Sequence, residues 1–190
     1  MAEDIIAGRN SVTEALRSER SINKILVQDG AKGGSIGEII AAAKAKNILI
    51  DYVKQEKLDK LVPGMRHQGI VAMVAPIAFQ TLDDVFAKAA AKNEDPFILL
   101  LDELQDPQNV GALIRTADAA GVHGVLMPKR RSCPLNAVVA KISAGAVEYM
   151  KVARVTNINN AIAELKEKGV WVFGTAAEGS VPMYRADLTG

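Results

Sequence analysis

The sequence predicts an α/β protein in which a small α/β unit precedes a Rossmann-like, doubly wound parallel sheet. Short aliphatic runs alternate with amphipathic helical segments along most of the chain, which is the pattern of βαβ units. Residues 97–101 are apolar throughout, as in a parallel strand covered on both faces. With 49% hydrophobic and 24% charged residues, the composition excludes disordered and fibrous classes.

The first unit, residues 1–76, is predicted to alternate helix and strand. A helix is expected to open near Asn10, with Ser11 and Glu14 forming a capping box. Period and composition then predict the following elements: strand 22–27, helix 34–47, strand 48–53, helix 55–61 and strand 69–75. Residues 77–96, an amphipathic helix and a turn, are expected to link the units.

The second unit, residues 97–190, continues the alternation. The predicted strands are 97–101, 124–127, 152–155 and 170–173, and the predicted helices are 107–120, 136–146 and 159–168. Ligands of such sheets bind at the carboxyl ends of the strands. Those ends are predicted at residues 102–103, 128–130, 156–157 and 174–175.

Several function classes receive no support. No apolar run is long enough to span a membrane, and the N-terminus does not resemble a secretory signal. Cys133 is the only cysteine, so an internal disulfide is excluded, a zinc site is not expected, and a reducing cytoplasm is favoured. The glycine cluster at 30–37 fits neither GxGxxG nor a P-loop and is interpreted as a turn.

Residues 106–117 contain the strongest local indication of a functional site. Asp106 followed by Pro107 predicts a capped helix start. The expected buried stripe consists of Val110, Leu113, Ile114 and Ala117. Gly111 and Arg115 lie four residues apart on another face, where the glycine leaves room for something to approach the backbone. Asn109 lies in the first turn, where the helix dipole favours an anion.

These residues carry a family resemblance. The pattern Asn109-x-Gly111-Ala112-x-x-Arg115-Thr116-Ala117 resembles motif 1 of the SpoU/TrmH ribose 2′-O-methyltransferases of the SPOUT superfamily. The similarity continues through residues 120–122, 128–132 and 141–146, and includes 8–16 and 67–72 of the first unit. The most similar subgroup is the bacterial enzymes that methylate a guanosine ribose of large-subunit ribosomal RNA.

The resemblance implies an RNA-binding domain followed by a SPOUT domain that works as a homodimer, with S-adenosylmethionine as methyl donor in a deep trefoil knot. It implies that Arg115 acts beside the target 2′-hydroxyl and that Asn109 helps to arrange that site. Gly174 and Thr175 correspond to the start of the cofactor pocket. The candidate RNA contacts are Arg9, Asn10, His67, Gln68, Lys129, Arg130 and Arg131.

The sequence departs from the family in one respect. The Gly-x-Glu-Gly loop of motif 2 and the Ser-Leu-Asn of motif 3 are missing, so we expect a SPOUT domain that lacks its C-terminal knot. We therefore expect the parent protein to be a methyltransferase and this chain as written to be inactive. A non-catalytic RNA-binding module is the alternative, and a small-molecule enzyme on a nucleotide-binding sheet is the third hypothesis.

Overall fold

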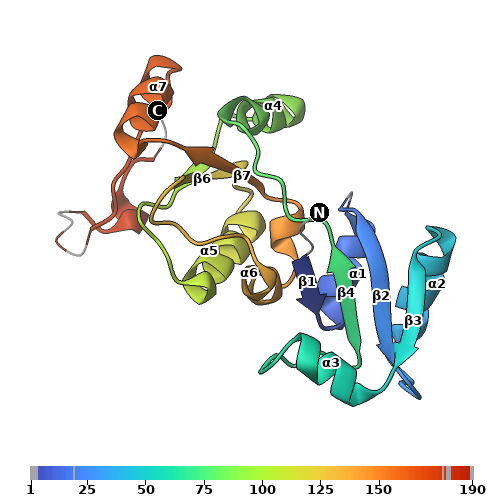
Figure 1. Cartoon of the computed structure of the whole chain (residues 1–190). Helices are drawn as coiled ribbons and strands as arrows, with labels where there is room; N and C mark the ends of the chain where they lie inside the picture. The colour runs from blue at the N-terminus through green and yellow to red at the C-terminus, as the bar shows by residue number, and fades with distance from the viewer. Residues whose placement is uncertain (1–3, 19, 177, 179–180, 189–190) are drawn as a thin grey trace.

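The computed structural model describes residues 4–18, 20–176, 178 and 181–188, and these form two separate β-sheets (Figure 1). Sheet A has the order β1-β4-β2-β3, and sheet B has the order β5-β6-β7. The strands of sheet A are β1 Asp4–Ala7, β2 Ile22–Gln28, β3 Leu49–Val53 and β4 Ile70–Val74. Its helices are α1 Arg9–Arg17, α2 Ile36–Ala45 and α3 Gln55–Leu61.

Sheet A is mixed. β2 and β3 are parallel, whereas β4 is antiparallel to both of its neighbours, β1 and β2. The predicted helices and strands from 22 to 75 are confirmed within a few residues, and helix 55–61 has the predicted bounds. Strand β1 was not predicted, because its four residues have no turn signal or partner nearby in sequence and pair with β4.

The predicted capping box on the first helix is wrong. Helix α1 begins at Arg9, and Gly8 is its N-cap with φ of 96°, without a capping side chain. Ser11 therefore lies inside the first turn and is buried, while Glu14 bonds to Arg17 instead of to the helix start. The tight turn at Gly8, which only glycine adopts readily, moves the helix start two residues upstream of Ser11.

Sheet B is parallel, as predicted. Its strands are β5 Ile98–Leu100, β6 Gly124–Pro128 and β7 Lys151–Val155. The remaining elements are α4 Leu82–Lys92, α5 Pro107–Ala119, α6 Ala137–Ile142, the 3₁₀ turn Ala146–Glu148, α7 Ile158–Glu167 and the 3₁₀ turn Met183–Arg185. Leu126 of β6 joins Val85 of α4 and Leu165 of α7, whereas Val125 and Met127 join the core that contains α5 and α6. Central strand β6 is therefore covered on both faces.

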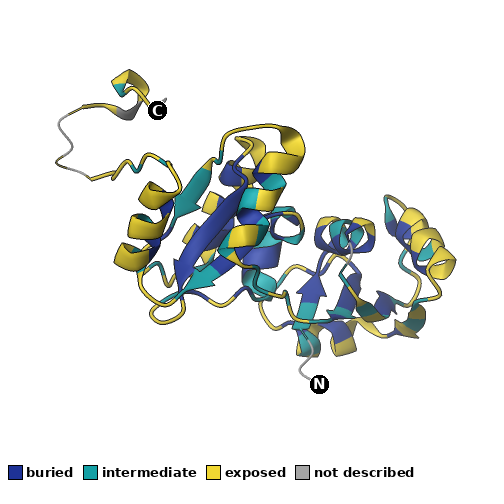
Figure 2. Ribbon diagram, turned by 90° about the horizontal axis from the view of Figure 1, so that it is seen from above, coloured by how far each residue is buried: buried dark blue, intermediate teal, exposed yellow. Residues whose placement is uncertain are grey.

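Two strand predictions in this half need correction. Residues 170–173 are not a strand, and Trp171 and Phe173 are exposed (68% and 46%). Apolar composition alone does not make a strand, because extended backbone also needs a hydrogen-bonded neighbour, and within the described residues this segment pairs with none. Strand β5 is an edge strand of three half-buried residues, not one covered on both faces. Exposed residues dominate the described part of 171–188 (Figure 2).

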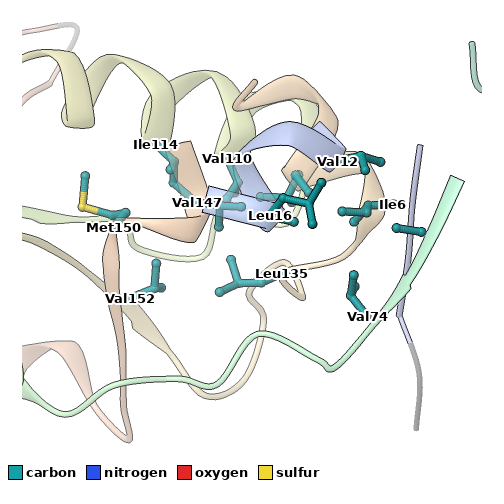
Figure 3. Packing of buried hydrophobic residues seen from close by; sticks show 14 of the residues in the cluster. Ile6, Val12, Leu16, Val74, Val110, Ile114, Leu135, Val147, Met150 and Val152 are labelled. Carbon is teal, nitrogen blue, oxygen red and sulfur yellow. The ribbon is translucent and has the colours of Figure 1, made fainter. Parts of the chain in front are cut away.

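The two sheets share one hydrophobic core. Ile6, Val12 and Leu16 from the first unit belong to the same buried cluster as Val110 and Ile114 of α5 (Figure 3). Polar contacts cross the same boundary: Arg20 binds Glu148 at 2.7 Å, and the Tyr149 hydroxyl donates to Glu14 at 2.9 Å. Helix α4, in the segment predicted as a linker, packs its fully buried Val85 onto sheet B.

Candidate functional site

Helix α5 begins as the sequence predicts. Asp106 is its N-cap and accepts hydrogen bonds from the backbone N–H groups of Gln108 (3.1 Å) and Asn109 (3.4 Å), with Pro107 at the first helical position. The capping carboxylate thus supplies the negative charge that this helix end favours. An external anion at the first turn would compete with it, so the predicted anion preference is met by the protein itself. Asn109 is exposed.

The close approach predicted at Gly111 is confirmed, and helix α6 makes it. It is buried, and a Cβ built on it would lie 2.7 Å from Cβ of Ile142 and 3.2 Å from the carbonyl oxygen of Val139. The glycine therefore allows α6 to approach α5 closely and does not make room for a ligand. The predicted buried stripe holds at Val110, Ile114 and Ala117, but Leu113 is 37% exposed.

Arg115 lies on the exposed side of α5. Its guanidinium makes no hydrogen bond or ion pair with any described residue. Arg9, Arg20 and Arg131, in contrast, are each held by acceptors of the protein. Five N–H donors of Arg115 therefore remain available to an external acceptor.

The carboxyl ends of the three strands of sheet B meet at one pocket, as the sequence predicts. The edge pocket has a volume of about 370 Å³ and is lined by residues 102–103, 128, 130–131 and 156–159. Glu103 forms an ion pair with Arg131 at 2.7 Å, which raises the pKa of this arginine, whereas Arg130 makes no hydrogen bond or ion pair with the described residues. Arg130 therefore lines this pocket with its guanidinium available to a ligand, and Asp102 contributes a carboxylate to the same lining. Asn109, Arg115 and Lys129 are not among its lining residues.

Backbone hydrogen bonds fix the loop that carries these cations. The Lys129 N–H donates to the Val155 carbonyl at 2.8 Å, and the Cys133 N–H donates to the Leu104 carbonyl at 3.0 Å. The Ser132 hydroxyl also donates to the carbonyl of Pro128. Lys129 and Arg130 are exposed at the surface of this loop. The edge pocket is thus built on an ordered frame with a basic rim.

A second pocket lies in the first unit, lined by residues from the end of β2, from α3 and from the segment before β4. This Arg9 pocket has a volume of about 680 Å³ and is lined by Arg9, Gln28, 31–32, Gln55, Asp59 and 65–69. It brings together three of the predicted RNA contacts, namely Arg9, His67 and Gln68. Asn10 is exposed and is not among the lining residues.

Two residues fix the shape of the Arg9 pocket. Arg9 donates from Nε to the Gln68 carbonyl (3.3 Å) and from a terminal nitrogen to the Gly33 carbonyl (3.1 Å). His67 is buried, and its Nδ1 accepts from the Gly69 N–H at 3.0 Å while its Nε2 lies 2.9 Å from Asp59. His67 uses both ring nitrogens within the protein, so its contribution is to hold the loop.

The predicted cofactor residues lie outside both pockets. Gly174 and Thr175 are exposed in the segment that the sequence predicted to follow a strand, and a Cβ built on Gly174 would meet nothing within 4 Å. The described residues around them therefore do not form a cradle for a donor. No cluster of three or more His, Cys, Asp or Glu side chains positioned for a metal occurs in the described part of the chain.

Sequence reasoning missed several polar residues of the Arg9 pocket, among them Gln28, Lys32 and Gln55. They come from the end of β2, the glycine turn and the start of α3, and none belongs to a local motif. The glycine turn at 30–34 was the available signal, since Gly33 and Gly34 both have positive φ angles.

None of the helices in the described ranges has the length and hydrophobicity that crossing a bilayer requires.

Comparison with known proteins identifies the family. Residues 96–190 match the model of the SpoU rRNA Methylase family, and residues 5–80 match the model described as RNA 2′-O ribose methyltransferase substrate binding. YacO of Bacillus subtilis (strain 168), described as a TrmH family tRNA/rRNA methyltransferase, is 47% identical over 92% of this chain and 70% of its own length. A protein of the same description from Staphylococcus saprophyticus is 44% identical over 98% of the chain and 75% of its own length.

Solved structures support the same fold. An AdoMet-bound rRNA methyltransferase from Sinorhizobium meliloti aligns with a TM-score of 0.76 at 23% identity, covering 97% of this chain and 66% of that one. A structure described as an RNA 2′-O ribose methyltransferase aligns with a TM-score of 0.75 at 20% identity, covering 97% and 67%. This chain belongs to the SpoU/TrmH family of RNA methyltransferases.

Proposed function

We propose that the chain serves in the methylation of a ribose 2′-hydroxyl, that of a guanosine in large-subunit ribosomal RNA, in the cytoplasm and as a homodimer. S-adenosylmethionine is the methyl donor of the family and is bound in the S. meliloti rRNA methyltransferase. The match of residues 5–80 to a 2′-O ribose substrate-binding model supports the ribose target. The observation that carries the proposal is the exposed, unpaired guanidinium of Arg115 on α5.

Methyl transfer requires that the ribose 2′-hydroxyl is oriented toward the methyl group and that the negative charge developing on its oxygen is stabilised. The ribose oxygen forms a bond to the methyl carbon as the carbon–sulfur bond breaks, and the hydroxyl proton leaves. Orientation of the reacting groups accounts for about 7–11 kcal/mol in favourable cases. A guanidinium remains charged in proteins, so Arg115 cannot accept the proton. Its role is to hold the adjacent phosphate and stabilise the developing negative charge on oxygen, while the proton passes to solvent.

Basic side chains on both units support RNA as the substrate. Arg9, Lys32 and Arg66 line the Arg9 pocket, and Lys129 and Arg130 are exposed beside the edge pocket. Contacts of this kind to phosphates release counterions, so binding should weaken steeply as salt rises. Gly174 and Thr175 lie open in the described structure, so the described residues around them do not enclose the methyl donor.

Methyl transfer from S-adenosylmethionine carrying a radiolabelled methyl group, to ribosomal and transfer RNA in separate reactions, tests the proposal. The proposal predicts label in ribosomal RNA, in alkali-resistant dinucleotides, because a 2′-O-methyl group blocks cleavage of the next phosphodiester; such label from this chain alone would overturn the expectation that it is inactive as written. Label in alkali-labile nucleotides would contradict the ribose target, and label in transfer RNA alone would contradict the ribosomal one. Salt-sensitive RNA binding without transfer would favour the non-catalytic module.

Substitution of Arg115 tests its role within the same assay. We expect Arg115→Lys to lower turnover at least about tenfold, since one ammonium replaces a bidentate fork. The midpoint of urea unfolding should not move, because the side chain is exposed and unpaired within the described residues. Arg17→Lys is the matched control, since Arg17 is an exposed helical arginine 67% accessible to solvent. Wild-type turnover by Arg115→Lys at neutral pH would refute the role.

A further inference from the structure

The Arg9 pocket combines positive charge with two side-chain amides, those of Gln28 and Gln55, that are hydrogen-bonded to each other. We propose that it holds one RNA nucleotide turned out of its helix, with the phosphate at Arg9, Lys32 and Arg66 and the polar edge of the base at Gln28 and Gln55. The proposal rests on the proposed function, because it takes RNA as the substrate. It adds which structural element of the RNA this unit selects.

The ionisable side chains of the pocket carry a net positive charge. Both side-chain hydrogen bonds of Arg9 go to neutral carbonyl groups, those of Gln68 and Gly33. Lys32 and Arg66 are exposed and make no hydrogen bond or ion pair with the described residues. The one carboxylate of the lining, that of Asp59, contacts His67 at 2.9 Å. Three cations and one carboxylate thus line the cavity, and this excess of positive charge suits a phosphodiester.

The amides of Gln28 and Gln55 suit a nucleobase. Gln28 Nε2 donates to Gln55 Oε1 at 3.4 Å, which leaves Gln28 Oε1 to accept and Gln55 Nε2 to donate to a ligand that contacts both amides. Watson–Crick edges of bases present a donor next to an acceptor, so an unpaired base matches this pair. Ala31 and the half-buried Met65 supply apolar lining for the ring.

The pocket is already assembled. Gly34 has a positive φ of 57°, and a Cβ on it would lie 2.3 Å from a terminal nitrogen of Arg9, so a larger residue here would displace this guanidinium. Its volume of about 680 Å³ lies within the ~300–1,000 Å³ of small-ligand sites. A paired base in an A-form helix cannot enter a cavity, whereas an unstacked base can. The geometry therefore selects a bulged or looped nucleotide over a duplex.

Binding to three matched RNA hairpins tests the proposal, with anisotropy as the readout and without S-adenosylmethionine. The first has a single unpaired guanosine, the second is fully paired, and the third has an abasic residue at the bulge. We expect the chain to bind the unpaired guanosine about tenfold more tightly than either other hairpin. Equal affinity for the paired hairpin would overturn the proposal. Equal affinity for the abasic one would show that phosphate alone is recognised and would overturn the base contact.

Variants separate the two parts of the pocket. Gln55→Ala should abolish the preference for the bulged base and leave the salt dependence unchanged. Lys32→Ala should weaken all three complexes and lower the slope of log K against log salt by about one. Lys44→Ala, an exposed lysine on α2 outside the pocket, is the control and should change neither quantity. Retention of the base preference in Gln55→Ala would overturn the proposal.

The outcome also separates this proposal from the proposed function. If the chain transfers methyl groups to ribose but binds the bulged and paired hairpins equally, only the pocket proposal is wrong. If the bulge preference and its loss in Gln55→Ala are seen while no ribose is methylated, the pocket proposal stands and the catalytic one is wrong. Failure to bind any RNA even at low salt would contradict both.

Discussion

Replacing Arg20 with methionine should destabilise the protein severely, because Arg20 is the cation of a buried network between the two sheets. Its guanidinium bonds to Glu148 at 2.7 Å, to Asp4 at 3.1 Å and to the Ala75 carbonyl at 2.7 Å. The side chains of Arg20 and Glu148 are only 7% and 3% exposed. Removing one partner of a buried pair costs about 3–5 kcal/mol, because the remaining charge stays buried without compensation. For a chain of this size that corresponds to roughly 6–20 °C in Tm.

The loss of stability in Arg20→Met should depend on pH in a defined direction. Burial raises the pKa of the Glu148 carboxyl above its ordinary value of 4.5, although Arg20 opposes the shift. A carboxyl with a raised folded-state pKa stabilises the fold fully below its ordinary value, and that stability is lost as pH rises through the folded-state pKa. Without Arg20 this pKa should rise further. The deficit of Arg20→Met should therefore be largest near pH 8 and shrink toward pH 5.

Urea unfolding at pH 5 and pH 8 measures these effects. The control is Glu148→Gln, which should cost less than Arg20→Met because Arg20 keeps Asp4 and the Ala75 carbonyl and no charge is left unpaired. The double variant should recover about half or more of the Arg20→Met loss at pH 8, because the stranded carboxylate is gone. The reasoning is wrong if Arg20→Met unfolds at the wild-type urea concentration, or if its deficit is the same at both pH values.

Two further predictions concern packing. Gly111→Ala should destabilise the protein by about 1–3 kcal/mol in urea unfolding, because the new methyl group would overlap Ile142. The control Gly37→Ala, in a helix with open space at its Cβ, should be neutral or stabilise by up to about 1 kcal/mol, and equal effects at both glycines would contradict the packing argument. Cys133 is 1% exposed and burial raises the pKa of its thiol, so alkylation by iodoacetamide at pH 8 should require unfolding; rapid labelling in native buffer would show that this site is open.

Local signals in the sequence predicted local structure well. Asp106 and Pro107 predicted the start of α5, and the capping hydrogen bonds are present. The alternation of strand and helix predicted a parallel sheet B, and three of the four strand ends it located meet in the edge pocket. In these cases the determining interactions lie within a few residues or follow from topology alone.

Packing between residues far apart in the chain could not be predicted from the sequence. The Ser11–Glu14 signature failed because the turn at Gly8 had already started the helix, whereas the similar Thr81–Asp84 spacing forms a true capping box on α4. Gly111 signalled a close approach, but spacing could not tell helix α6 from a ligand.

The Arg9 pocket shows the same limit for the candidate site. Family resemblance indicated Arg9, His67 and Gln68, while the fold alone brings Gln28 and Gln55 beside them.

The common core of the two sheets has a consequence for how this protein can be divided. Cutting the chain between residues 76 and 97 would leave Val12 and Leu16 on one fragment without the α5 side chains that belong to their cluster. Each fragment would then expose an apolar face to solvent, and we expect the two fragments to aggregate separately or to associate when they are co-expressed. The Arg9 pocket and Arg115 consequently belong to parts of the chain that share one core, and we expect the distance between them to be the same with and without bound RNA.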